Sequence, residues 1–338
     1  MVVIRQDLAT RDWTIFSTER SKRPKDFRHE EGKLGSKGKC KDEYVESCPF
    51  CKGNEHMTPR ELFSIREDGE WLVRVVLNKY PALEIKNFCG PVTRHIKGPY
   101  LSMDGIGSHE VIIESPRHND DLATMDRRNL ENVLLTYWHR SVDLSKNEDY
   151  QLIIIFRNHG IEAGTSLEHP HSQLIATPFV PGYVRNKLYE SQRYFDNFGR
   201  CPYCDMIDYE LKDRERLVYE DEKYVAFTPY ASVVPYNILV LPKKHQANFV
   251  EASEEEIRDL ASVFKVVLAK LYYLLDNPDY NYVIDSSPTD KSGERHYHWH
   301  IEILPRLTTR AGFEIGSGVT INFIFPEDCA RHLREVKV

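Results

Sequence analysis

The first half of the chain alternates short apolar runs with one long helical pattern. Residues 71–77 and 110–114 have the length and apolar content of strands. Between residues 127 and 144 the apolar side chains recur every three or four positions, which predicts an amphipathic helix. Two further strands are predicted at 152–156 and 169–176. The pattern is therefore strand-rich, with a single major helix between strands.

The second half repeats this order. A Ser-Glu-Glu-Glu sequence at 253–256 forms a capping box, which predicts a helix from there to about Leu275. Strands are predicted on both sides of that helix, at 216–227 (as a pair), 237–241, 280–284 and 299–304. Each half is thus an α+β unit built on an antiparallel sheet with a helix packed on it. We expect two tandem units, residues 1–197 and 198–338, whose strands can merge into one continuous sheet.

Composition narrows the class of protein. Of the 338 residues, 41% are hydrophobic and 11% aromatic, which is enough for a packed core and excludes a disordered chain. The formal net charge of −7 gives no basic surface for nucleic acid or anionic lipid. The longest aliphatic run is far shorter than the roughly 20 residues that cross a bilayer, and the N-terminus has no apolar signal-peptide core. We expect a cytoplasmic protein with neither nucleic acid nor a membrane as partner.

Four of the seven cysteines form two copies of one motif, Cys48-Pro-Phe-Cys51 and Cys201-Pro-Tyr-Cys204. An odd number of cysteines without a secretion signal argues against a disulfide framework. A Cys-x-x-Cys turn places two thiolates on one soft cation, such as zinc. The alternative is a redox pair, which should open a helix after a strand. Cys51 is followed by Lys-Gly-Asn, which is typical of a loop, so the metal interpretation is favoured.

A tetrahedral metal needs two more ligands, and histidines follow each motif. His118 and His169 follow the first motif, and His245 and His296 follow the second, with a separation of 51 residues in both cases. The interval before the first histidine differs between the halves, which indicates an insertion around residues 85–108. This repeat predicts two zinc sites per chain, with the ligands Cys48, Cys51, His118 and His169, and Cys201, Cys204, His245 and His296.

The segment His169-Pro-His171-Ser-Gln173 carries three polar side chains at alternate positions. On a strand these project from one face, while Ser172 points the other way. If His169 binds the metal, His171 is held two residues away on rigid backbone. A neutral imidazole there is a nucleophile toward phosphorus, and the Gln173 amide can donate to a phosphoryl oxygen.

These residues resemble the active-site segment of the galactose-1-phosphate uridylyltransferase family, which belongs to the histidine-triad superfamily. The resemblance covers nearly the whole chain, through Arg20-Ser-Lys-Arg23-Pro, the first Cys-x-x-Cys, Ser115-Pro-Arg-His118, Gly164-Thr-Ser166 and Gly312-Phe-Glu314. It implies a fold of tandem histidine-triad (HIT-like) units, of which only the first keeps the nucleophile. It also implies a homodimer, in which the partner chain completes the active site.

The resemblance assigns roles to individual positions. His171 attacks the α-phosphorus of a nucleotide sugar and becomes a nucleotidyl-histidine, which a second phosphate then attacks in a ping-pong scheme. Gln173 assists at the phosphoryl oxygens. The remaining implied substrate contacts are Arg20, Arg23, Asn78, Asn158, Ser166, Ser172, Phe313 and Glu314. Without the resemblance, the basic stretch at 20–39 is interpreted first as a solvated flexible segment, with arginines that clamp a phosphorylated ligand as the alternative.

Departures from the family pattern leave the substrate open. Ser172 stands where uridylyltransferases have Gly, and Lys79 stands where an acidic residue is common. Ser172, the second Cys-x-x-Cys and the C-terminal motif from Gly312 to Asp328 look more like an ADP-glucose phosphorylase. We expect UDP-glucose and galactose 1-phosphate as substrates, with adenylyl transfer from ADP-glucose or a dinucleotide polyphosphate to phosphate as the alternative. A non-catalytic zinc module is the remote third possibility. His298 is either a second nucleophile or, given Trp299 and the missing Gln, a degenerate copy.

Overall fold

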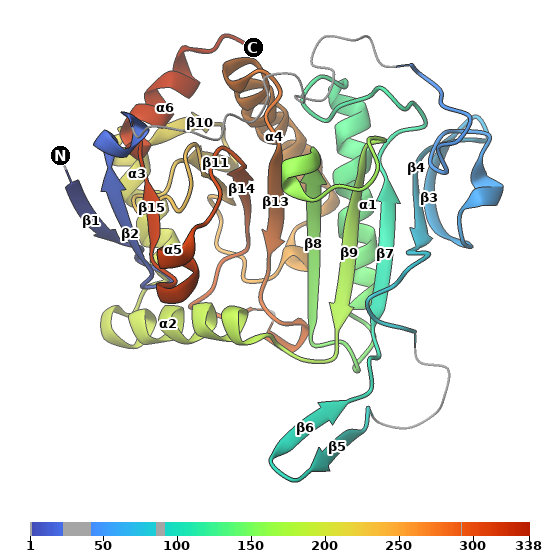
Figure 1. Ribbon diagram of the computed structural model, residues 1–338, viewed down its shortest axis with the longest axis horizontal. Helices are drawn as coiled ribbons and strands as arrows, with labels where there is room; N and C mark the ends of the chain where they lie inside the picture. The colour runs from blue at the N-terminus through green and yellow to red at the C-terminus, as the bar shows by residue number, and fades with distance from the viewer. Residues whose placement is uncertain (1, 23–41, 86–91, 292) are drawn as a thin grey trace.

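The computed structural model describes residues 2–22, 42–85, 92–291 and 293–338, and its centre is a ten-stranded sheet (Figure 1). Neighbouring strands pair antiparallel wherever the register is defined. In spatial order the strands are β10 (Leu217–Glu220), β11 (Tyr224–Phe227), β12 (Ile238–Pro242), β14 (His300–Pro305), β13 (Tyr280–Asp285), β8 (Leu152–His159), β9 (His171–Thr177), β7 (Ser108–Ile113), β4 (Glu70–Leu77) and β3 (Glu61–Glu67). The α+β prediction is confirmed.

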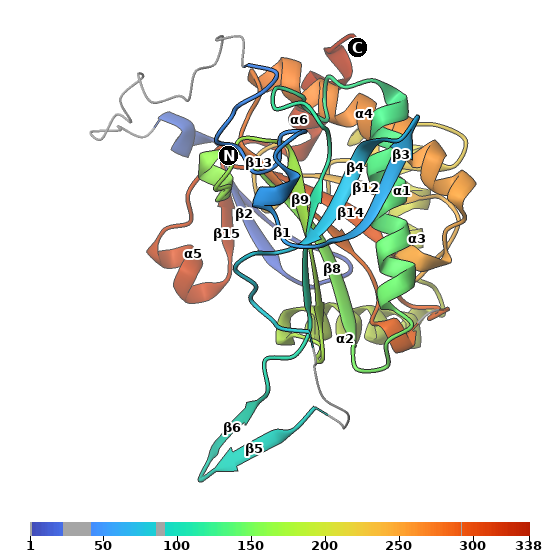
Figure 2. The same ribbon diagram turned by 90° about the vertical axis from the view of Figure 1, so that its right-hand side faces the viewer.

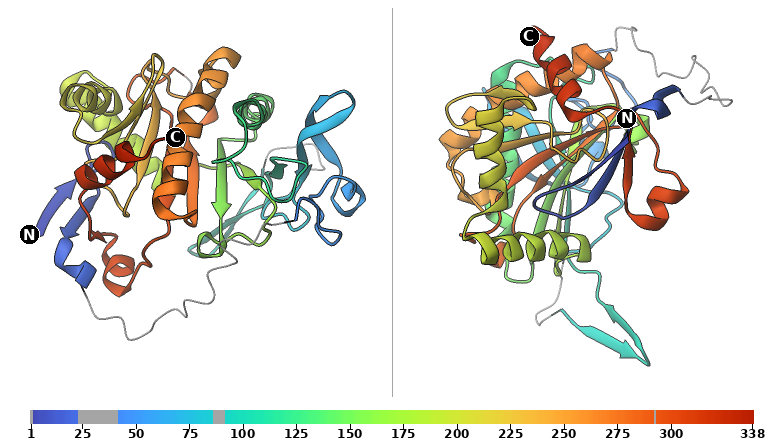
Figure 3. Two further views of the ribbon diagram at one scale, coloured as in Figure 1. Left: turned by 90° about the horizontal axis from the view of Figure 1, so that it is seen from above. Right: turned by 90° about the vertical axis from the view of Figure 1, so that its left-hand side faces the viewer.

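The sheet has an internal two-fold relation between the halves of the chain. At the centre of the sheet, β13 pairs with β8, and Val283 lies opposite Phe156. From either edge to the centre the strands follow the same order, β3, β4, β7, β9, β8 in the first half and β10, β11, β12, β14, β13 in the second. One helix from each half, α1 (Arg127–Leu144) and α4 (Glu254–Leu275), covers the same face, and the two pack against each other (Figure 3). Both helices have the predicted bounds, and the Asp126 and Ser253 side chains cap their N-termini.

The opposite face differs between the two units. In the second unit it is covered by α2 (Gly182–Phe198) and α3 (Pro202–Asp213), whose apolar side chains pack with those of β11 and β12. In the first unit it carries a smaller cluster around Cys48 and Cys51. The sequence patterns did not predict α2 or α3. Pro181 immediately before α2 and Pro202 at the first turn of α3 are signals of helix starts that could have indicated them.

A small sheet joins the two ends of the chain. β1 (Val2–Gln6) pairs antiparallel with β2 (Trp13–Ser17), and β2 pairs parallel with β15 (Thr320–Asn322). Arg5 also contacts Glu327 at 2.8 Å, in α6 (Pro326–Glu335). The first residues of the chain therefore pack beside its last elements. The division into residues 1–197 and 198–338 stays a prediction.

Residues 94–103, within the predicted insertion, form a protruding hairpin. β5 (Arg94–Lys97) and β6 (Tyr100–Met103) extend away from the body of the protein (Figure 2). The short helices are η1 (Thr18–Lys22), η2 (Glu55–Met57), η3 (Ile161–Ala163), η4 (Phe249–Glu251), η5 (Thr289–Lys291) and α5 (Gly312–Ser317). Within the part of the chain described, no helix is both long and apolar enough to span a membrane.

Candidate active site and metal centres

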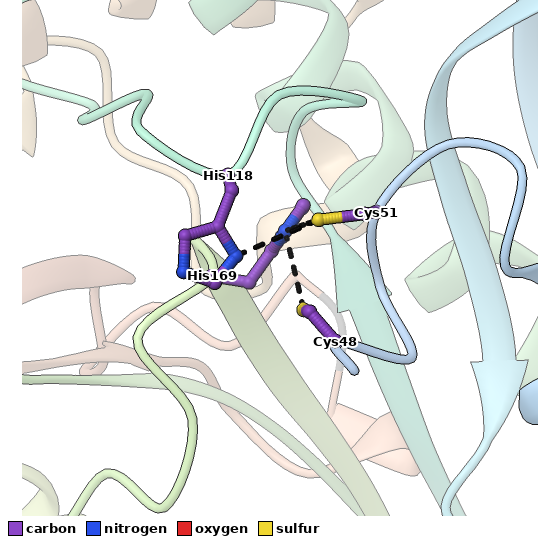
Figure 4. Close-up of side chains that lie close together, drawn as sticks. All are labelled: Cys48, Cys51, His118 and His169. Atoms are coloured by element: carbon purple, nitrogen blue, oxygen red, sulfur yellow. Dashed lines mark hydrogen bonds between the residues drawn. The ribbon is translucent and has the colours of Figure 1, made fainter. Parts of the chain in front are cut away.

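The four predicted ligands of the first metal site converge in the structure (Figure 4). Cys48 and Cys51 lie on a turn before β3, His118 follows β7, and His169 immediately precedes β9. The Nδ1 atom of His169 lies 3.7 Å from both sulfurs, and that of His118 lies 3.6 Å from the Sγ of Cys51. All four are buried, and their ligand atoms lie within 4.8 Å of one another. Two thiolates and two imidazoles are a donor set for a soft divalent cation.

The surroundings of His169 fix which of its nitrogens faces the sulfurs. Its Nε2 donates to the carbonyl oxygen of Ser115 at 2.8 Å, so Nδ1 is left with its lone pair toward the two cysteines. Burial lowers the pKa of His169 to about 4, and the neutral ring is the form that binds a metal.

A second group forms in the second unit, with one ligand different from the prediction. It comprises Cys201, Cys204, His245 and His298. The Nδ1 atoms of His245 and His298 lie 3.3 and 3.5 Å from the Sγ of Cys204. The prediction that His296 completes this set is wrong, because its Nδ1 atom lies 3.3 Å from the carboxylate of Glu294 instead.

The error comes from a loop of different length. Gln173 pairs with Phe156, 17 residues earlier, whereas Glu302 pairs with Val283, 19 residues earlier. The loop before β14 is thus two residues longer than the loop before β9, and the equal separations of 51 residues were coincidental. His298 is the counterpart of His169, and therefore not of His171.

The structure also bears on the redox alternative for the Cys-x-x-Cys motifs. The first motif lies in a turn, in agreement with the predicted loop. In the second, Cys201 is the N-cap residue of α3, but the preceding element is the helix α2 and not a strand. Each motif lies beside two histidine nitrogens, as expected for metal ligands.

His171 begins β9 with its ring oriented by the backbone. Its Nδ1 lies 2.8 Å from the carbonyl oxygen of His169, which can only accept, so Nδ1 carries the proton and Nε2 the lone pair. Burial lowers the pKa of His171, and the nearby Arg157 guanidinium lowers it further. The ring is therefore neutral near pH 7, with Nε2 free to act as a nucleophile.

Amide side chains lie on the same face of the sheet as His171. The Gln173 Oε1 lies 2.9 Å from the His109 Nε2 and 3.5 Å from the Asn78 Nδ2. The Asn158 Oδ1 accepts from the Asn281 Nδ2 at 2.7 Å. Sequence reasoning missed His109 and Asn281. Asn281 is a polar residue inside a predicted strand and His109 directly precedes one, and that was the available signal.

Ser172 lies on the opposite face and does not contact this site. It is fully buried, and its hydroxyl group donates to the carboxylate of Glu114 and contacts the phenol oxygen of Tyr137, in α1. Glu114 also pairs with the buried Arg157 of β8. Strand alternation directs the Ser172 side chain toward the helices and away from the face that carries His171, so its contacts do not support the predicted role in substrate binding.

Among the residues that the structure describes, no hydrogen bond links the remaining predicted contacts to His171. Ser166 is exposed on the loop before β9, and Arg20 is exposed on η1. Phe313 is exposed on α5, where the Glu314 carboxylate accepts from the backbone N–H groups of Ala311 and Ile321. Figures 1 and 3 place α5 beside β15 and apart from β9. Arg23 lies outside the described residues.

The structure thus combines a duplicated α+β fold with two Cys2His2 groups and a buried histidine on the same sheet face as two amides. The chain belongs to the galactose-1-phosphate uridyl transferase family, whose N-terminal domain model matches residues 3–181 and whose C-terminal domain model matches residues 187–321. It is therefore a nucleotidyltransferase of the uridylyltransferase type.

Two relatives match over nearly the whole chain. The ADP-glucose phosphorylase of Arabidopsis thaliana is 35% identical over 338 residues, which cover 99% of this chain and 93% of the relative. The galactose-1-phosphate uridylyltransferase of Thermotoga maritima is 31% identical over 346 residues, covering 100% and 99%. The crystal structure of an Arabidopsis thaliana ADP-glucose phosphorylase with bound ADP-glucose superposes with a TM-score of 0.84 at 33% identity and covers 100% of both chains.

Proposed function

We propose that the protein moves a nucleoside monophosphate from a nucleotide sugar to a second phosphate through a covalent nucleotidyl-His171. The first-choice substrates are UDP-glucose and galactose 1-phosphate. The observation that carries the proposal is the fixed tautomer of His171, whose Nε2 lone pair lies on the same face as the amides of Gln173 and Asn158.

The reaction proceeds in two displacements. In the first, the Nε2 lone pair attacks the α-phosphorus, a nitrogen–phosphorus bond forms, and the bond to the bridging oxygen breaks. That oxygen leaves with its electron pair as a sugar 1-phosphate, which is already a stabilised anion and needs no strong general acid. In the second, a phosphate oxygen of the acceptor attacks the same phosphorus and the lone pair returns to Nε2.

The protein supplies the orientation and the hydrogen bonds for this chemistry. Nδ1 keeps its proton and donates to the carbonyl oxygen of His169, and this hydrogen bond stabilises the positive charge that develops on the ring. The amide of Gln173 donates to a non-bridging phosphoryl oxygen as negative charge accumulates there. Asn158 supplies a second amide from the neighbouring strand β8.

We further propose that both Cys2His2 groups hold zinc. In a tetrahedral site with Zn–S of about 2.3 Å and Zn–N of about 2.0 Å, neighbouring sulfur and nitrogen ligands lie roughly 3.5 Å apart. The Sγ–Nδ1 distances of 3.3 to 3.7 Å in the two groups fit this geometry. Zinc at the first group would fix the backbone of His169, whose carbonyl oxygen orients His171.

Adenylyl transfer from ADP-glucose to phosphate is the second candidate. It is favoured by the 35% identity to an ADP-glucose phosphorylase and by the second Cys-x-x-Cys motif, which the family resemblance associates with that activity. Both candidates use the same His171 chemistry, and they differ in the base and in the acceptor.

The assembly and location are also part of the proposal. A homodimer would let a partner chain supply the sugar-phosphate contacts that this chain does not bring near His171, with Phe313 and Glu314 as the candidates for that role. We place the enzyme in the cytoplasm because its proposed substrates are nucleotide sugars and sugar phosphates.

Intact-protein mass spectrometry tests the proposal. The purified protein is incubated with UDP-glucose or ADP-glucose, without an acceptor, at neutral pH and then at acid pH. We expect an acid-labile adduct of one nucleoside monophosphate per chain, which is absent from His171→Asn. Only a uridylyl adduct supports the first candidate, and only an adenylyl adduct supports the second. An adduct that persists in His171→Asn contradicts the mechanism.

A further inference from the structure

The two amides beside His171 are useful to a phosphoryl oxygen only in one of their two orientations. When the N–H2 group of an amide faces the anion, the amide donates a hydrogen bond to it. When the carbonyl oxygen faces the anion, the two repel each other. Nothing intrinsic to a glutamine or asparagine side chain selects between these orientations. The neighbours of the carbonyl end must therefore select it.

His109 provides this selection for Gln173. The backbone N–H of Ala82 donates to the Nδ1 atom of His109 at 3.0 Å, so Nδ1 carries the lone pair. The proton of the neutral ring is then on Nε2, which lies 2.9 Å from the Gln173 side chain. A protonated Nε2 can only donate, and the Gln173 atom that faces it must be the carbonyl oxygen.

Asn78 reinforces the same orientation. Its Oδ1 accepts from the backbone N–H of Tyr80 at 2.8 Å, which identifies the other atom of the amide as Nδ2. That Nδ2 lies 3.5 Å from the Gln173 Oε1 and can donate to it, whereas its 3.1 Å contact with the protonated His109 Nε2 joins two donors and is no hydrogen bond. Two donors thus converge on one oxygen, and the N–H2 group of Gln173 is left to face elsewhere.

Asn281, in the second unit, does the same for Asn158. Its Nδ2 lies 3.0 Å from the carbonyl oxygen of Ala163, which can only accept, so this atom must be the donor. The same Nδ2 lies 2.7 Å from Asn158, and the atom of Asn158 that faces it must be Oδ1. The N–H2 group of Asn158 is therefore also free to donate.

We infer that His109 and Asn281 are positioning residues that hold Gln173 and Asn158 with their N–H2 groups available to the transferring phosphoryl group. The inference rests on the proposed function, since it names how that site is arranged. It also gives the second unit a role in the reaction, because β13 supplies Asn281.

Double-mutant cycles test the inference in the full-length enzyme, with the nucleotide sugar that labels the wild type. His109→Leu should slow single-turnover formation of the adduct by about 10-fold, with substrate Kd unchanged, since one oriented donor to the anion is lost. In a Gln173→Ala background, His109→Leu should have almost no further effect, because the residue on which it acts is gone. His109→Gln, which keeps an N–H donor at the end of the side chain, should restore most of the rate. Additive losses, or unchanged rate in His109→Leu, would overturn the inference.

A parallel cycle addresses Asn281. Asn281→Asp replaces the donor by an acceptor, so Asn158 should turn its N–H2 group toward the new carboxylate and the rate should fall. The negative charge could slow the reaction by itself, and Asn158→Ala separates the two effects. A rate loss that persists at full size in the Asn158→Ala background indicates a charge effect alone and contradicts the inference.

Nitrogen-15 NMR of the imidazole rings supplies a readout that does not depend on activity. The His109 signal, assigned by its loss in His109→Gln, should have the shift pattern of the Nε2–H tautomer in the substrate-free protein. An Nδ1–H tautomer would overturn the inference even if the adduct forms. If the tautomer is as inferred and no nucleotide sugar labels the wild type, the arrangement of the amides stands while the proposed reaction fails.

Discussion

His300 holds in the second unit the hydrogen bond that His171 holds in the first. Each ring donates from Nδ1 to the carbonyl oxygen of the histidine two residues earlier, at 3.0 Å in His300 and 2.8 Å in His171. The surroundings of Nε2 differ, because the Nε2 of His300 lies 3.5 Å from the carboxylate of Asp285. Lys187, in α2, pairs with the same carboxylate at 3.1 Å. The second unit thus keeps the orientation of the histidine but fills the space in front of it with an ion pair.

This relationship predicts different results for two matched substitutions. His171→Asn should abolish the nucleotidyl adduct because the attacking nitrogen is lost. His300→Asn should leave one adduct per chain, because His300 lies beneath α2 and its Nε2 faces Asp285. The measurement is the adduct stoichiometry from intact mass after incubation with nucleotide sugar. Two adducts on the wild type, or a halved yield in His300→Asn, would mean that the second histidine also reacts.

The reassigned metal ligand gives a second matched pair. His298→Ala should lower the metal content by one ion per chain, because it removes one of four ligands from a set that has no spare ligand among its described neighbours. His296→Ala should leave the metal content unchanged, although the two residues are only two positions apart. Elemental analysis of the purified variants provides the measurement. Loss of metal in His296→Ala, with retention in His298→Ala, would restore the assignment made from sequence spacing.

Much of the fold was predictable because the signals were local. The helices at 127–144 and 254–275 have continuous apolar periodicity, and the second also has a complete capping box. The first metal site was predictable because Cys-x-x-Cys fixes two ligands within one turn. By contrast, α2 was not predicted, and of its buried residues (Val184, Lys187 and Ser191) only Val184 is apolar.

The errors arose where position depends on loop length or on strand partners. The choice between His296 and His298 depended on two extra residues in a loop, which no periodicity reveals. The positions of Phe313 and Glu314 depend on how α5 packs. His109 and Gln173 are 64 residues apart in the chain and meet only because β7 pairs with β9. The pairing of these two strands cannot be derived from a single sequence.

Ser172 should matter for stability and little for substrate binding. Ser172→Ala removes a hydroxyl group from a buried network with Glu114 and Tyr137. We expect the free energy of unfolding in urea to fall by about 1–3 kcal/mol, which is the usual cost of leaving buried polar partners unsatisfied. The KM for the nucleotide sugar should not change, whereas Gln173→Ala is expected to slow the reaction. A raised KM with unchanged stability would return Ser172 to the substrate site.

Breaking the buried ion pair between Lys187 and Asp285 should strongly lower the free energy of unfolding. Lys187→Met leaves the carboxylate of Asp285 buried without its partner, and we expect a loss of about 3–5 kcal/mol in urea unfolding. The pKa of Lys187 lies well above its usual value despite burial, because Asp285 and Glu302 favour the charged form. Arg193→Ala, which removes an exposed pair with Glu190 in the same helix, is the control and should cost less than about 1 kcal/mol. Equal losses would show that burial of the pair is not what matters.

Stability should fall in mild acid, and His159 is one of the buried histidines that should contribute to this loss. Burial lowers the pKa of this residue below its ordinary value of 6.5, and the positive charge of Arg157 acts in the same direction, against Asp121, Asp279 and a hydrogen bond with Asn277. The unfolded chain therefore takes up a proton as the pH falls through about 6.5 while the folded protein does not. The free energy of unfolding should decrease over this interval by up to about 1.4 kcal/mol per pH unit.

His159→Gln should reduce that dependence. Urea unfolding of the wild type and variant at about pH 7 and about pH 5.5 measures it, since the stability difference between the two proteins should shift in favour of the variant at the lower pH. Tyr280→Phe is the control, because this ring stacks on His159 at 4.7 Å and its buried hydroxyl group has no hydrogen-bond partner in the described structure. It changes the same pocket without removing the titrating group, so it should keep the acid sensitivity of the wild type. Parallel pH dependences for His159→Gln and the wild type would exclude His159 as the cause, and the acid sensitivity would then have to come from other buried groups.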